Sequence, residues 1–566
     1  MDQIIKRFCA RIDFESYEDF KENFDITTPA NFNFAYDVVD EWACIEPDKQ
    51  ALVWCDDRAQ KTFTFADIAR LSNQAANLFS EHGIGKGDIV MVMLRQRWEY
   101  WIIATALCKL GAILSPATIQ LTAKDILYRL QSSGARALVA LDDDYVVKQC
   151  ELALESPTDI VYKLLVDKHT DNPNWDDFST LLASQPEQFE RPHGEAASQN
   201  SDTMLIYFTS GTTGLAKMVM HDFTHPLGHI LTARYWQQVQ ENQLHCSVSD
   251  SGWAKFGWGK IYGQWICGAT VFAYDAERFD AKALLQRIEQ YQLTTFCVPP
   301  TMYRMMLTED VSAYDLSSVQ TFTTAGEPLN PEINLQWQKA TGKLIREGFG
   351  QSEGPVLLAT FSWLTPRPGS MGKPSPLFDI ELLDDNGQPV GDGMDGSICI
   401  CNLDLRFPPG LFVGYYQDEE KSCEAVGGKY YNLHDLAWRD VDGYYTFIGR
   451  DDDVIKSSGY RIGPFEVESA LAEHPAVLES AVTAVADEIR GSIVKATITL
   501  QAGYVASDEL AKELQEHVKQ VTAPYKYPRI VEFVDQLPKT VSGKVKRAEI
   551  RTVDAGGVWE GEASVR

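Results

Sequence analysis

The chain has 566 residues, of which 45% are hydrophobic and 23% charged, a composition typical of a globular protein and not of a disordered or fibrous one. Its 80 acidic and 51 basic side chains give a formal net charge of -29, which argues against nucleic acid as a partner. A chain of this length exceeds one hydrophobic core, so we expect two or more domains.

The beginning of the chain carries no clear targeting signal. Residues 1–20 include early acidic side chains and no apolar core, so we expect neither a signal peptide nor a transit peptide. The most apolar stretch, residues 100–119, is interrupted by Lys109, Gly111 and Pro116, which predicts a buried helix and turn and no membrane span. The cysteines form no CxxC pair, so neither a zinc site nor a disulfide framework is indicated. These features predict a cytoplasmic protein.

From about residue 50 to 450, short β-rich runs alternate with helix-like runs. This rhythm predicts an α/β fold with parallel sheets. The β-rich runs are 137–144, 204–210, 294–300 and 319–327, and the helix-like runs are 66–83, 281–292 and 331–342.

The last third of the chain has a different pattern. Residues 378–400 resemble paired strands joined by an Asn-Gly turn, which predicts a β-rich subregion. We expect a boundary near Arg450, followed by a helix that starts at Pro464, a favoured first-turn residue. The predicted domains are therefore 1–450 and 451–566, the second a small α+β domain.

The segment "TSGTTGLAK", residues 209–217, follows an apolar strand and combines glycines with hydroxyl side chains. Glycines let backbone N–H groups approach an anion and hydroxyls add donors, so the loop is typical of phosphate binding. The pattern GxxxxGK[ST] is absent, which disfavours an ordinary P-loop NTPase. The alternative from these residues alone is a plain Ser/Thr/Gly turn.

Four further motifs follow in order: "TTAGEP" (323–328), "EGFGQSEG" (347–354), "GRDDDVIKSSGYRIGPFEVE" (449–468) and "PKTVSGKVKR" (538–547). With the loop they resemble the motif series of adenylate-forming enzymes over roughly residues 40–552. "SDSGWAKFGWGK", "PRPGSMGKPSP" and "TAPYKYPR" are most similar to the medium-chain acyl-CoA synthetases. The resemblance implies a large N-terminal domain of several subdomains and a small mobile α+β C-terminal domain. It also implies ATP, Mg²⁺ and coenzyme A.

The resemblance implies a role for individual residues. Lys544 bridges the acid carboxylate and the α-phosphate, Lys217 closes the phosphate loop, and Glu353 with Thr212 supports Mg²⁺. The phosphate-loop positions are Thr209, Ser210, Gly211, Thr212, Thr213 and Gly214. The nucleotide positions are Gly326, Glu327, Pro328, Glu347, Gly348, Phe349, Gly350, Gln351, Ser352, Asp435 and Arg450, with Phe349 stacking on the base and Asp435 binding the ribose.

The same resemblance implies a hinge at Asp452 and a coenzyme A site in the small domain. The coenzyme A positions are Ser458, Gly459, Tyr460, Arg461, Arg490, Lys519, Tyr527 and Arg529. The acyl pocket would be lined by His225, Trp253, Phe256 and Gly257, and its aromatic bulk predicts a short, closed pocket.

Three features depart from or compete with the family pattern. "LHD" at 433–435 replaces the usual "TGD", and "GLAK" replaces a loop that commonly ends in proline and lysine. His221, His225 and His229 are spaced as on one helix face, which would suit a metal. Because Pro226 interrupts the series and no acidic partner follows, we favour a first helix that lines the acyl pocket.

The resulting prediction is an AMP-forming acyl-CoA synthetase for a medium-chain, branched or aromatic acid. Two alternatives are an adenylation enzyme that serves a carrier protein and a non-catalytic adenylate-binding protein. The expected partners are small molecules, with neither nucleic acid nor a membrane span. The sequence leaves the acid open, and equally whether the chain is a monomer or a homodimer.

Overall fold

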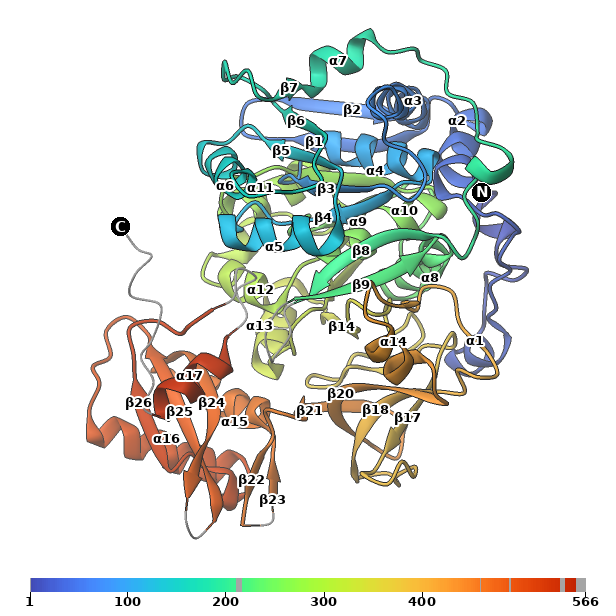
Figure 1. Cartoon of the computed structure of the whole chain (residues 1–566). Helices are drawn as coiled ribbons and strands as arrows, with labels where there is room; N and C mark the ends of the chain where they lie inside the picture. The colour runs from blue at the N-terminus through green and yellow to red at the C-terminus, as the bar shows by residue number, and fades with distance from the viewer. Residues whose placement is uncertain (1, 210–215, 459, 488–489, 540–544, 556–566) are drawn as a thin grey trace.

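The structure is a computed structural model that describes residues 2–209, 216–458, 460–487, 490–539 and 545–555. A large N-terminal domain with mixed helices and strands is followed by a smaller C-terminal domain, drawn in orange and red in Figure 1. The predicted α/β class is confirmed by this arrangement.

The first large sheet carries the strand that precedes the phosphate loop. Its strands pair in parallel from β8 through β4, β3, β5 and β6 to β7, whereas β9 and β19 add antiparallel strands at the other edge. In spatial order they are β19 (Gly414–Tyr415), β9 (Lys217–Asp222), β8 (Thr203–Thr209), β4 (Ile113–Pro116), β3 (Ile89–Met93), β5 (Ala137–Leu141), β6 (Tyr162–Val166) and β7 (Asp176–Asp177).

The second large sheet carries the two motifs "TTAGEP" and "EGFGQSEG". Its central strands from β1 to β14 are parallel, and its edge strands β2, β15 and β16 are antiparallel. In spatial order they are β16 (Lys373–Pro374), β15 (Leu358–Ala359), β14 (Arg346–Phe349), β13 (Thr321–Thr324), β12 (Thr295–Cys297), β10 (Leu244–Ser247), β11 (Thr270–Tyr274), β1 (Gln50–Cys55) and β2 (Gln60–Thr64).

Helices connect these strands and begin where the sequence supplies capping groups. The Thr64 hydroxyl accepts from the Asp67 N–H and the Asp67 carboxylate accepts from the Thr64 N–H, which starts α3. The first part of the apolar stretch forms the buried helix α4, as predicted, and Gly111 ends this helix at φ 72°. Residues 113–116 form the strand β4, where only a turn was predicted. The helices of the large domain are α1 (Tyr17–Asn23), α2 (Glu41–Ile45), α3 (Phe65–Glu81), α4 (Glu99–Leu110), α5 (Ala123–Ser133), α6 (Asp144–Leu154), α7 (Phe178–Ser184), α8 (His225–Ile230), α9 (Ala254–Lys260), α10 (Tyr262–Ile266), α11 (Ala281–Tyr291), α12 (Pro300–Met306), α13 (Pro331–Thr341) and α14 (Glu419–Val426).

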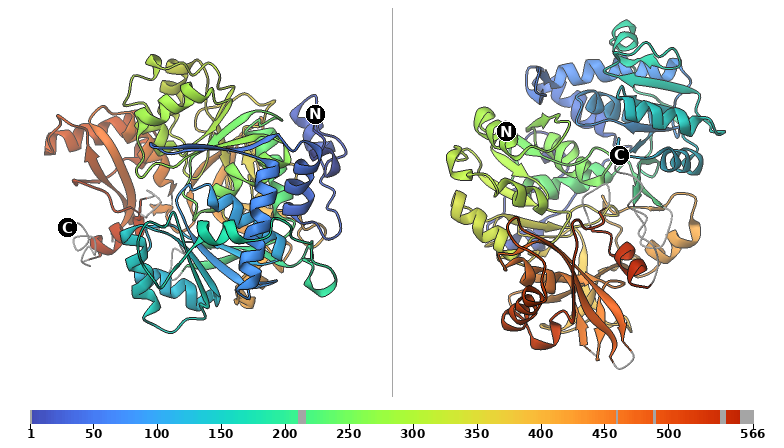
Figure 2. Two further views of the ribbon diagram at one scale, coloured as in Figure 1. Left: turned by 90° about the horizontal axis from the view of Figure 1, so that it is seen from above. Right: turned by 90° about the vertical axis from the view of Figure 1, so that its left-hand side faces the viewer.

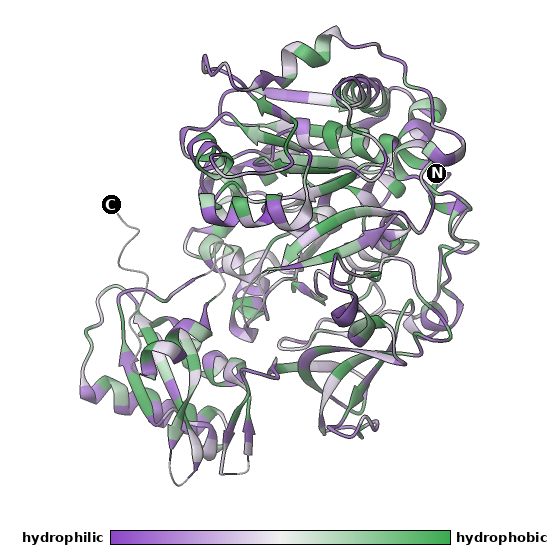
Figure 3. Cartoon of the chain, in the orientation of Figure 1, coloured by the Kyte–Doolittle hydropathy of each residue, from purple (hydrophilic) through white to green (hydrophobic). Residues whose placement is uncertain are grey.

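Apolar residues fill the interior between these layers. Figure 3 shows hydrophobic colours along the inner strands, with hydrophilic colours gathered on the outer loops and helix ends. Within the described residues, no helix is both long and apolar enough to cross a membrane.

A smaller antiparallel sheet closes the large domain. It is formed in order by β17 (Asp379–Leu383), β18 (Asp395–Cys401), β20 (Tyr430–Arg439) and β21 (Tyr445–Arg450). β17 and β18 pair as the sequence predicts. Their connection contains the Asn-Gly turn, closed by Asp384 N–H donating to the Gln388 carbonyl, but it runs on to residue 394. The strands are therefore not joined by that turn alone.

The C-terminal domain has a hydrophobic core of its own, built around buried residues such as Val467, Val482 and Leu514. Its helix α15 (Pro464–Ala472) starts at the predicted proline. The other elements are β22 (Ile455–Ser457), β23 (Tyr460–Ile462), β24 (Val477–Asp487), β25 (Gly491–Leu500), α16 (Asp508–Val521), β26 (Ile530–Phe533) and α17 (Arg547–Asp554). The left view in Figure 2 shows this domain at one side of the large domain, and Figure 1 shows it as a separate lobe. The boundary at residue 450 stays a prediction.

Candidate active site

The two ends of the phosphate loop are fixed by a strand pair. Thr209 at the end of β8 lies opposite Lys217 at the start of β9. The Lys217 ammonium lies 5.1 Å from the centre of the Tyr415 ring, and the Tyr415 hydroxyl donates to Glu353 Oε1 at 3.2 Å. Lys217 and Glu353, 136 positions apart in the chain, are thus brought to one place by Tyr415. Ser210, Gly211, Thr212, Thr213 and Gly214 lie outside the described residues.

Glu353 is a half-buried carboxylate whose backbone is held in place by the Phe412 N–H, which donates to the Glu353 carbonyl at 2.7 Å. Burial raises the pKa of Glu353, while the Tyr415 hydroxyl and the Lys217 and Arg450 charges act in the opposite direction. A carboxylate with a cation beside it and few other partners can bind a hard metal ion that also contacts phosphate.

Asp435 and Arg450 face each other across β20 and β21. The buried Asp435 carboxylate accepts from Gln351 Nε2 at 2.5 Å, and the Arg450 guanidinium approaches it to 3.8 Å. Gln351 Nε2 also donates to the Leu433 carbonyl at 2.7 Å. The side chain of Gln351 therefore ties the "EGFGQSEG" motif to the strand that carries Asp435.

The departure "LHD" has a structural consequence at His434. This exposed residue has φ 58°, in the left-handed region that glycine adopts without strain. The Asn432 side chain accepts from the His434 N–H at 2.8 Å and holds the bend. A histidine thus holds a left-handed backbone at this bend, and Asp435 is buried next to it.

The motif "TTAGEP" follows β13 and turns at Gly326, which has φ 103°. Lys255 Nζ from α9 donates to the Ala325 carbonyl at 2.7 Å, and the Thr301 hydroxyl donates to Glu327 Oε2 at 2.8 Å. Pro328 completes this turn. The position of the turn at the carboxyl end of a parallel strand is typical of ligand sites in α/β sheets.

Glu347 and Phe349 stand on β14. The Leu329 N–H donates to Glu347 Oε1 at 3.2 Å, and burial raises the pKa of Glu347 to about 8. Phe349 is half-buried and lies 6.3 Å from the Phe447 ring, so it packs against β21. Ser352 offers its carbonyl to His221 Nε2 at 2.7 Å.

Two tryptophans occupy the space beside the glycines of this motif. A Cβ on Gly348 would lie 2.5 Å from the Trp236 indole, and a Cβ on Gly350 would lie 2.5 Å from the Trp258 indole. Side chains larger than hydrogen are therefore excluded at both positions. Trp258 belongs to α9, so this helix forms a wall directly beside the motif.

The predicted pocket residues on α9 have different surroundings. Gly257 lies against Tyr207 and Tyr262, because a Cβ there would be 2.7 Å from the Tyr207 hydroxyl and 3.0 Å from the Tyr262 ring. Phe256 is fully buried and packs on Tyr100 of α4, with ring centres 4.7 Å apart. Trp253 is half-buried at the N-cap of α9. Their role in binding the acid stays a prediction.

The spacing of the three histidines matches one helix face, but they do not share a helix. His221 lies on β9, whereas His225 and His229 lie on α8, yet the three rings form one buried cluster, with neighbouring ring centres 3.9 and 4.6 Å apart. His229 Nε2 and His225 Nε2 share a hydrogen bond at 3.1 Å. Burial lowers the pKa of His221 to about 4 and that of His229 to about 3, so these imidazoles are neutral. In the described part of the chain, no group of three His, Cys, Asp or Glu side chains is arranged to hold a metal ion.

The predicted coenzyme A residues fall into two groups. The Ser458 N–H donates to the Arg490 carbonyl at 2.9 Å, next to Tyr460 and Arg461. In the second group, Arg529 donates to the Tyr527 hydroxyl at 2.7 Å and Lys519 lies 4.2 Å from the Tyr527 ring centre. Tyr525, which sequence reasoning missed, joins the groups by stacking on Tyr460 at 4.1 Å. Gly459 lies outside the described residues.

The predicted hinge lies directly after β21. Asp452 is exposed, and its carboxylate is 3.9 Å from the Arg450 Nε. The next residue, Asp453, pairs with Arg551 and Arg547 of α17, which follows the predicted lysine motif. Lys544 itself lies outside the described residues.

The structure therefore gathers Lys217, Glu353, Gln351, Asp435 and Arg450 around one edge of the large domain. Tyr415 and Tyr207, which line this region, were not predicted. The first lies in no quoted motif, and the second reads as an ordinary apolar strand residue, so the sequence carries no direct signal for either.

Residues 39–416 match the family described as AMP-binding enzyme, and residues 466–544 match its AMP-binding enzyme C-terminal domain. The mitochondrial acyl-coenzyme A synthetase ACSM3 of Mus musculus is 42% identical over 550 residues, which cover 95% of this chain and 93% of that protein. The mitochondrial acyl-coenzyme A synthetase ACSM4 of Homo sapiens is 41% identical over 544 residues, covering 94% and 92%.

Solved structures agree with the fold. The anthranilate CoA ligase AuaEII in complex with anthranoyl-AMP superposes with a TM-score of 0.84 at 27% identity, covering 93% of this chain and 98% of that one. The benzoate CoA ligase from Burkholderia xenovorans LB400 gives a TM-score of 0.78 at 27% identity, covering 92% and 100%.

These relatives correct one prediction and confirm another. The expected cytoplasmic location is wrong, because the similar acyl-coenzyme A synthetases are mitochondrial proteins. The motif resemblance is confirmed: the chain belongs to the family of AMP-binding, adenylate-forming enzymes, with the medium-chain acyl-CoA synthetases among its relatives.

Proposed function

We propose that this chain is an AMP-forming acyl-CoA synthetase that converts a carboxylic acid, ATP and coenzyme A to acyl-CoA, AMP and pyrophosphate. The observation that carries the proposal is the meeting of Lys217, Glu353, Asp435 and Arg450 at one edge, linked by Tyr415 and Gln351. These side chains supply two cations and two carboxylates where a nucleotide and its metal would need them.

In the first half-reaction, the acid carboxylate attacks the α-phosphorus of ATP and pyrophosphate leaves. Both reactants are anionic, so fixed positive charge must offset their repulsion. Lys217 and Arg450 lie near Glu353 of the motif "EGFGQSEG" and would supply this positive charge. Lys544 would contact the reacting carboxylate and α-phosphate. Asp435, held by Gln351, would accept hydrogen bonds from the ribose hydroxyls.

The donor set at Glu353 suits Mg²⁺, which prefers oxygen ligands. Glu353 and Thr212 would hold the ion, and the bound ion would offset the phosphate charge. Tyr415 orients the Glu353 carboxylate through their hydrogen bond, and Lys217 lies close enough to lower its pKa.

In the second half-reaction, the coenzyme A thiol attacks the acyl carbonyl and AMP leaves. We place the domain boundary near Arg450 and the hinge at Asp452, where the chain passes exposed between the two domains. The group formed by Lys519, Tyr527 and Arg529 offers two cations and a ring to the coenzyme A nucleotide. Gly459 and Ser458 would border the path of the pantetheine arm.

The acid is expected to be medium-chain, branched or aromatic. Trp236 and Trp258 fill the space beside Gly348 and Gly350, which supports a short pocket and not a long tunnel. The relatives reported above are named acyl-CoA synthetases, an anthranilate CoA ligase and a benzoate CoA ligase, and these names support the same range of acids.

The proposal is tested by incubating the purified chain with ATP, Mg²⁺ and a series of acids, with and without coenzyme A. When acid and coenzyme A are both present, we expect turnover that yields AMP and acyl-CoA in equal amounts. When either is left out, we expect no turnover. Formation of ADP in place of AMP, or AMP formation that does not depend on the acid, would contradict the proposal.

A further inference from the structure

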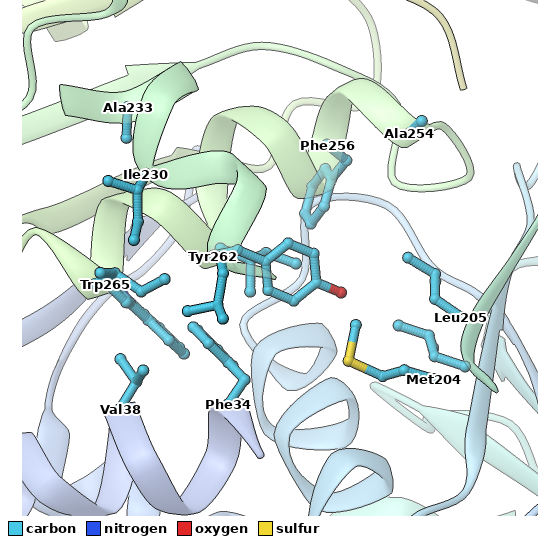
Figure 4. Close-up of a cluster of buried hydrophobic side chains, with 14 of the residues drawn as sticks. Phe34, Val38, Met204, Leu205, Ile230, Ala233, Ala254, Phe256, Tyr262 and Trp265 are labelled. Atoms are coloured by element: carbon cyan, nitrogen blue, oxygen red, sulfur yellow. The ribbon is translucent and has the colours of Figure 1, made fainter. Parts of the chain in front are cut away.

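The strand β8, which leads into the phosphate loop, is buried on both of its faces. Leu205 and Tyr207 belong to one hydrophobic cluster with Tyr262, and Figure 4 shows Leu205 and Tyr262 in this cluster. Ile206 and Phe208 face the other way, because successive side chains alternate along a strand, and they belong to a second cluster. Packing on both sides therefore fixes the strand up to the start of the loop.

The helix α5 packs on the second of these faces. Its Ile126 and Leu130 are fully buried in the cluster that contains Phe208. The helix begins at a capping box, in which the Thr122 hydroxyl accepts from the Asp125 N–H and the Asp125 carboxylate accepts from the Thr122 N–H. A well-capped and partly buried helix is thus a firm support beside the end of β8.

Two consecutive residues of α5 contact the chain at the ends of the loop, residues 209–217. The Tyr128 hydroxyl donates to the Ala216 carbonyl at 2.9 Å, and the Tyr128 ring lies edge-on to the Phe208 ring with centres 6.4 Å apart. The Arg129 guanidinium lies 4.8 Å from the centre of the same Phe208 ring. Phe208 directly precedes the loop and Ala216 is its last residue but one, so Tyr128 contacts the chain on both sides of it.

The hydrogen bond to Ala216 fixes the peptide unit that joins Ala216 to Lys217. A peptide unit is planar, so a bond that holds its carbonyl also holds the direction of the N–H at its other end. Lys217 is further held by its pairing with Thr209 and by the Tyr415 ring, 5.1 Å from its ammonium. A carbonyl oxygen carries partial negative charge, so an Ala216 carbonyl that turned toward the phosphates of ATP would repel them.

Ala216 stands at the position where the loop of similar enzymes commonly has proline. Proline fixes φ at about −65° and so restricts the backbone from within the chain, which alanine does not do. In this chain a restriction on the same peptide unit comes from outside the loop, through the Tyr128 hydroxyl.

We propose, on the basis of the proposed function, that Tyr128 is a positioning residue for the first half-reaction. Its hydroxyl holds the peptide unit between Ala216 and Lys217 in the orientation in which the loop binds the phosphates of ATP. Tyr128 acts through the loop and not on the substrate. The second half-reaction starts after pyrophosphate has left, so it does not depend on this hydrogen bond.

The test separates the two half-reactions in Tyr128→Phe, which removes the hydroxyl and keeps the ring beside Phe208. In acid-dependent exchange of labelled pyrophosphate into ATP, kcat/KM for ATP should fall about tenfold, mostly through a higher KM. A tenfold change corresponds to about 1.4 kcal/mol, which is within the usual contribution of one hydrogen bond. Formation of acyl-CoA from supplied acyl-adenylate and coenzyme A should stay within about twofold of the wild type.

Tyr36→Phe is the matched control. Tyr36 is half-buried like Tyr128, and its hydroxyl also donates to a backbone carbonyl, that of Lys109 at 3.3 Å. Lys109 precedes β4, which runs parallel to β8, so this bond lies at the opposite edge of the sheet from the phosphate loop. The control should leave both half-reactions within about twofold of the wild type.

Ala216→Pro is a second test, because it restrains the same backbone in another way. Added to Tyr128→Phe, it should restore most of the lost exchange, whereas in the wild type it should change the exchange little. Unchanged exchange in Tyr128→Phe, an equal fall in both half-reactions, or no rescue by Ala216→Pro would overturn the inference and leave the proposed function intact. Absence of exchange in the wild type with every acid would contradict the proposed function itself, and the inference with it.

Discussion

Replacing Glu347 with glutamine should remove a strong dependence of stability on pH. Glu347 is buried on β14, and its Oε1 accepts only from the Leu329 N–H at 3.2 Å among the described hydrogen bonds. Burial raises its pKa from 4.5 to about 8, so the folded protein keeps this carboxyl protonated near neutral pH. Glutamine preserves the acceptor and cannot lose a proton.

The sign follows from proton binding. Between pH 4.5 and 8 the folded state holds the proton and the unfolded state does not, so the free energy of unfolding falls as pH rises. The contribution is complete below the unfolded value and is lost as pH passes the folded one. At about 1.36 kcal/mol per pH unit, raising the pH from about 5 to about 8 should cost the wild type about 4 kcal/mol relative to Glu347→Gln.

The assay is urea unfolding of both proteins at half-unit steps from pH 5 to 8, following the transition of the large domain by tryptophan fluorescence. The free energy of unfolding of the wild type, minus that of Glu347→Gln, should fall steadily as the pH rises over this range. Glu424→Gln, at an exposed position on α14, is the control and should run parallel to the wild type. Parallel curves for Glu347→Gln as well would refute the reasoning.

Three further changes test other parts of the site. Trp258→Gly opens space beside Gly350, so the acid optimum in kcat/KM should move to bulkier acids while KM for ATP stays within about twofold; an unchanged optimum would remove Trp258 from the pocket. Asp452→Pro should still form acyl-adenylate but lose thioester formation, since a fixed φ restricts the hinge, and normal overall turnover would place the hinge elsewhere. His434→Gly should raise the free energy of unfolding by about 1 kcal/mol by relieving the left-handed backbone, whereas His434→Ala should not; equal effects would show that the backbone there is not strained.

Much of the fold could be predicted because local chemistry and long-range packing agree. The first part of the apolar stretch at 100–119 forms the buried α4, and Pro464 starts α15 where a first-turn proline is favoured. The alternation of strands and helices gave parallel sheets, since such connections return the chain in one direction.

The predictions that failed or fell short depended on information that spacing does not contain. The intervals between His221, His225 and His229 match one helix face, but His221 pairs with Leu205 in a strand and only the fold brings the rings together. Periodicity reports the angle around an element, not where that element begins.

Side-chain partners from distant segments were equally invisible. Tyr415 links Lys217 to Glu353, although Tyr415 lies more than sixty residues from Glu353 in the chain. Tyr525 reaches Tyr460 only because α16 returns the chain to β23. Within the motif itself, the sequence indicated Asp435, while the bend at His434 that positions it became apparent only from the backbone.

Acid-dependent exchange of labelled pyrophosphate into ATP, measured without coenzyme A, tests the central claim most directly. Without a thiol, labelled pyrophosphate can enter ATP only if pyrophosphate leaves when the acyl-adenylate forms and that step can run in reverse. We predict exchange that requires both Mg²⁺ and the acid and that falls by several orders of magnitude in Lys544→Ala. If an acid supports the formation of AMP and acyl-CoA but gives no pyrophosphate exchange, the account is contradicted.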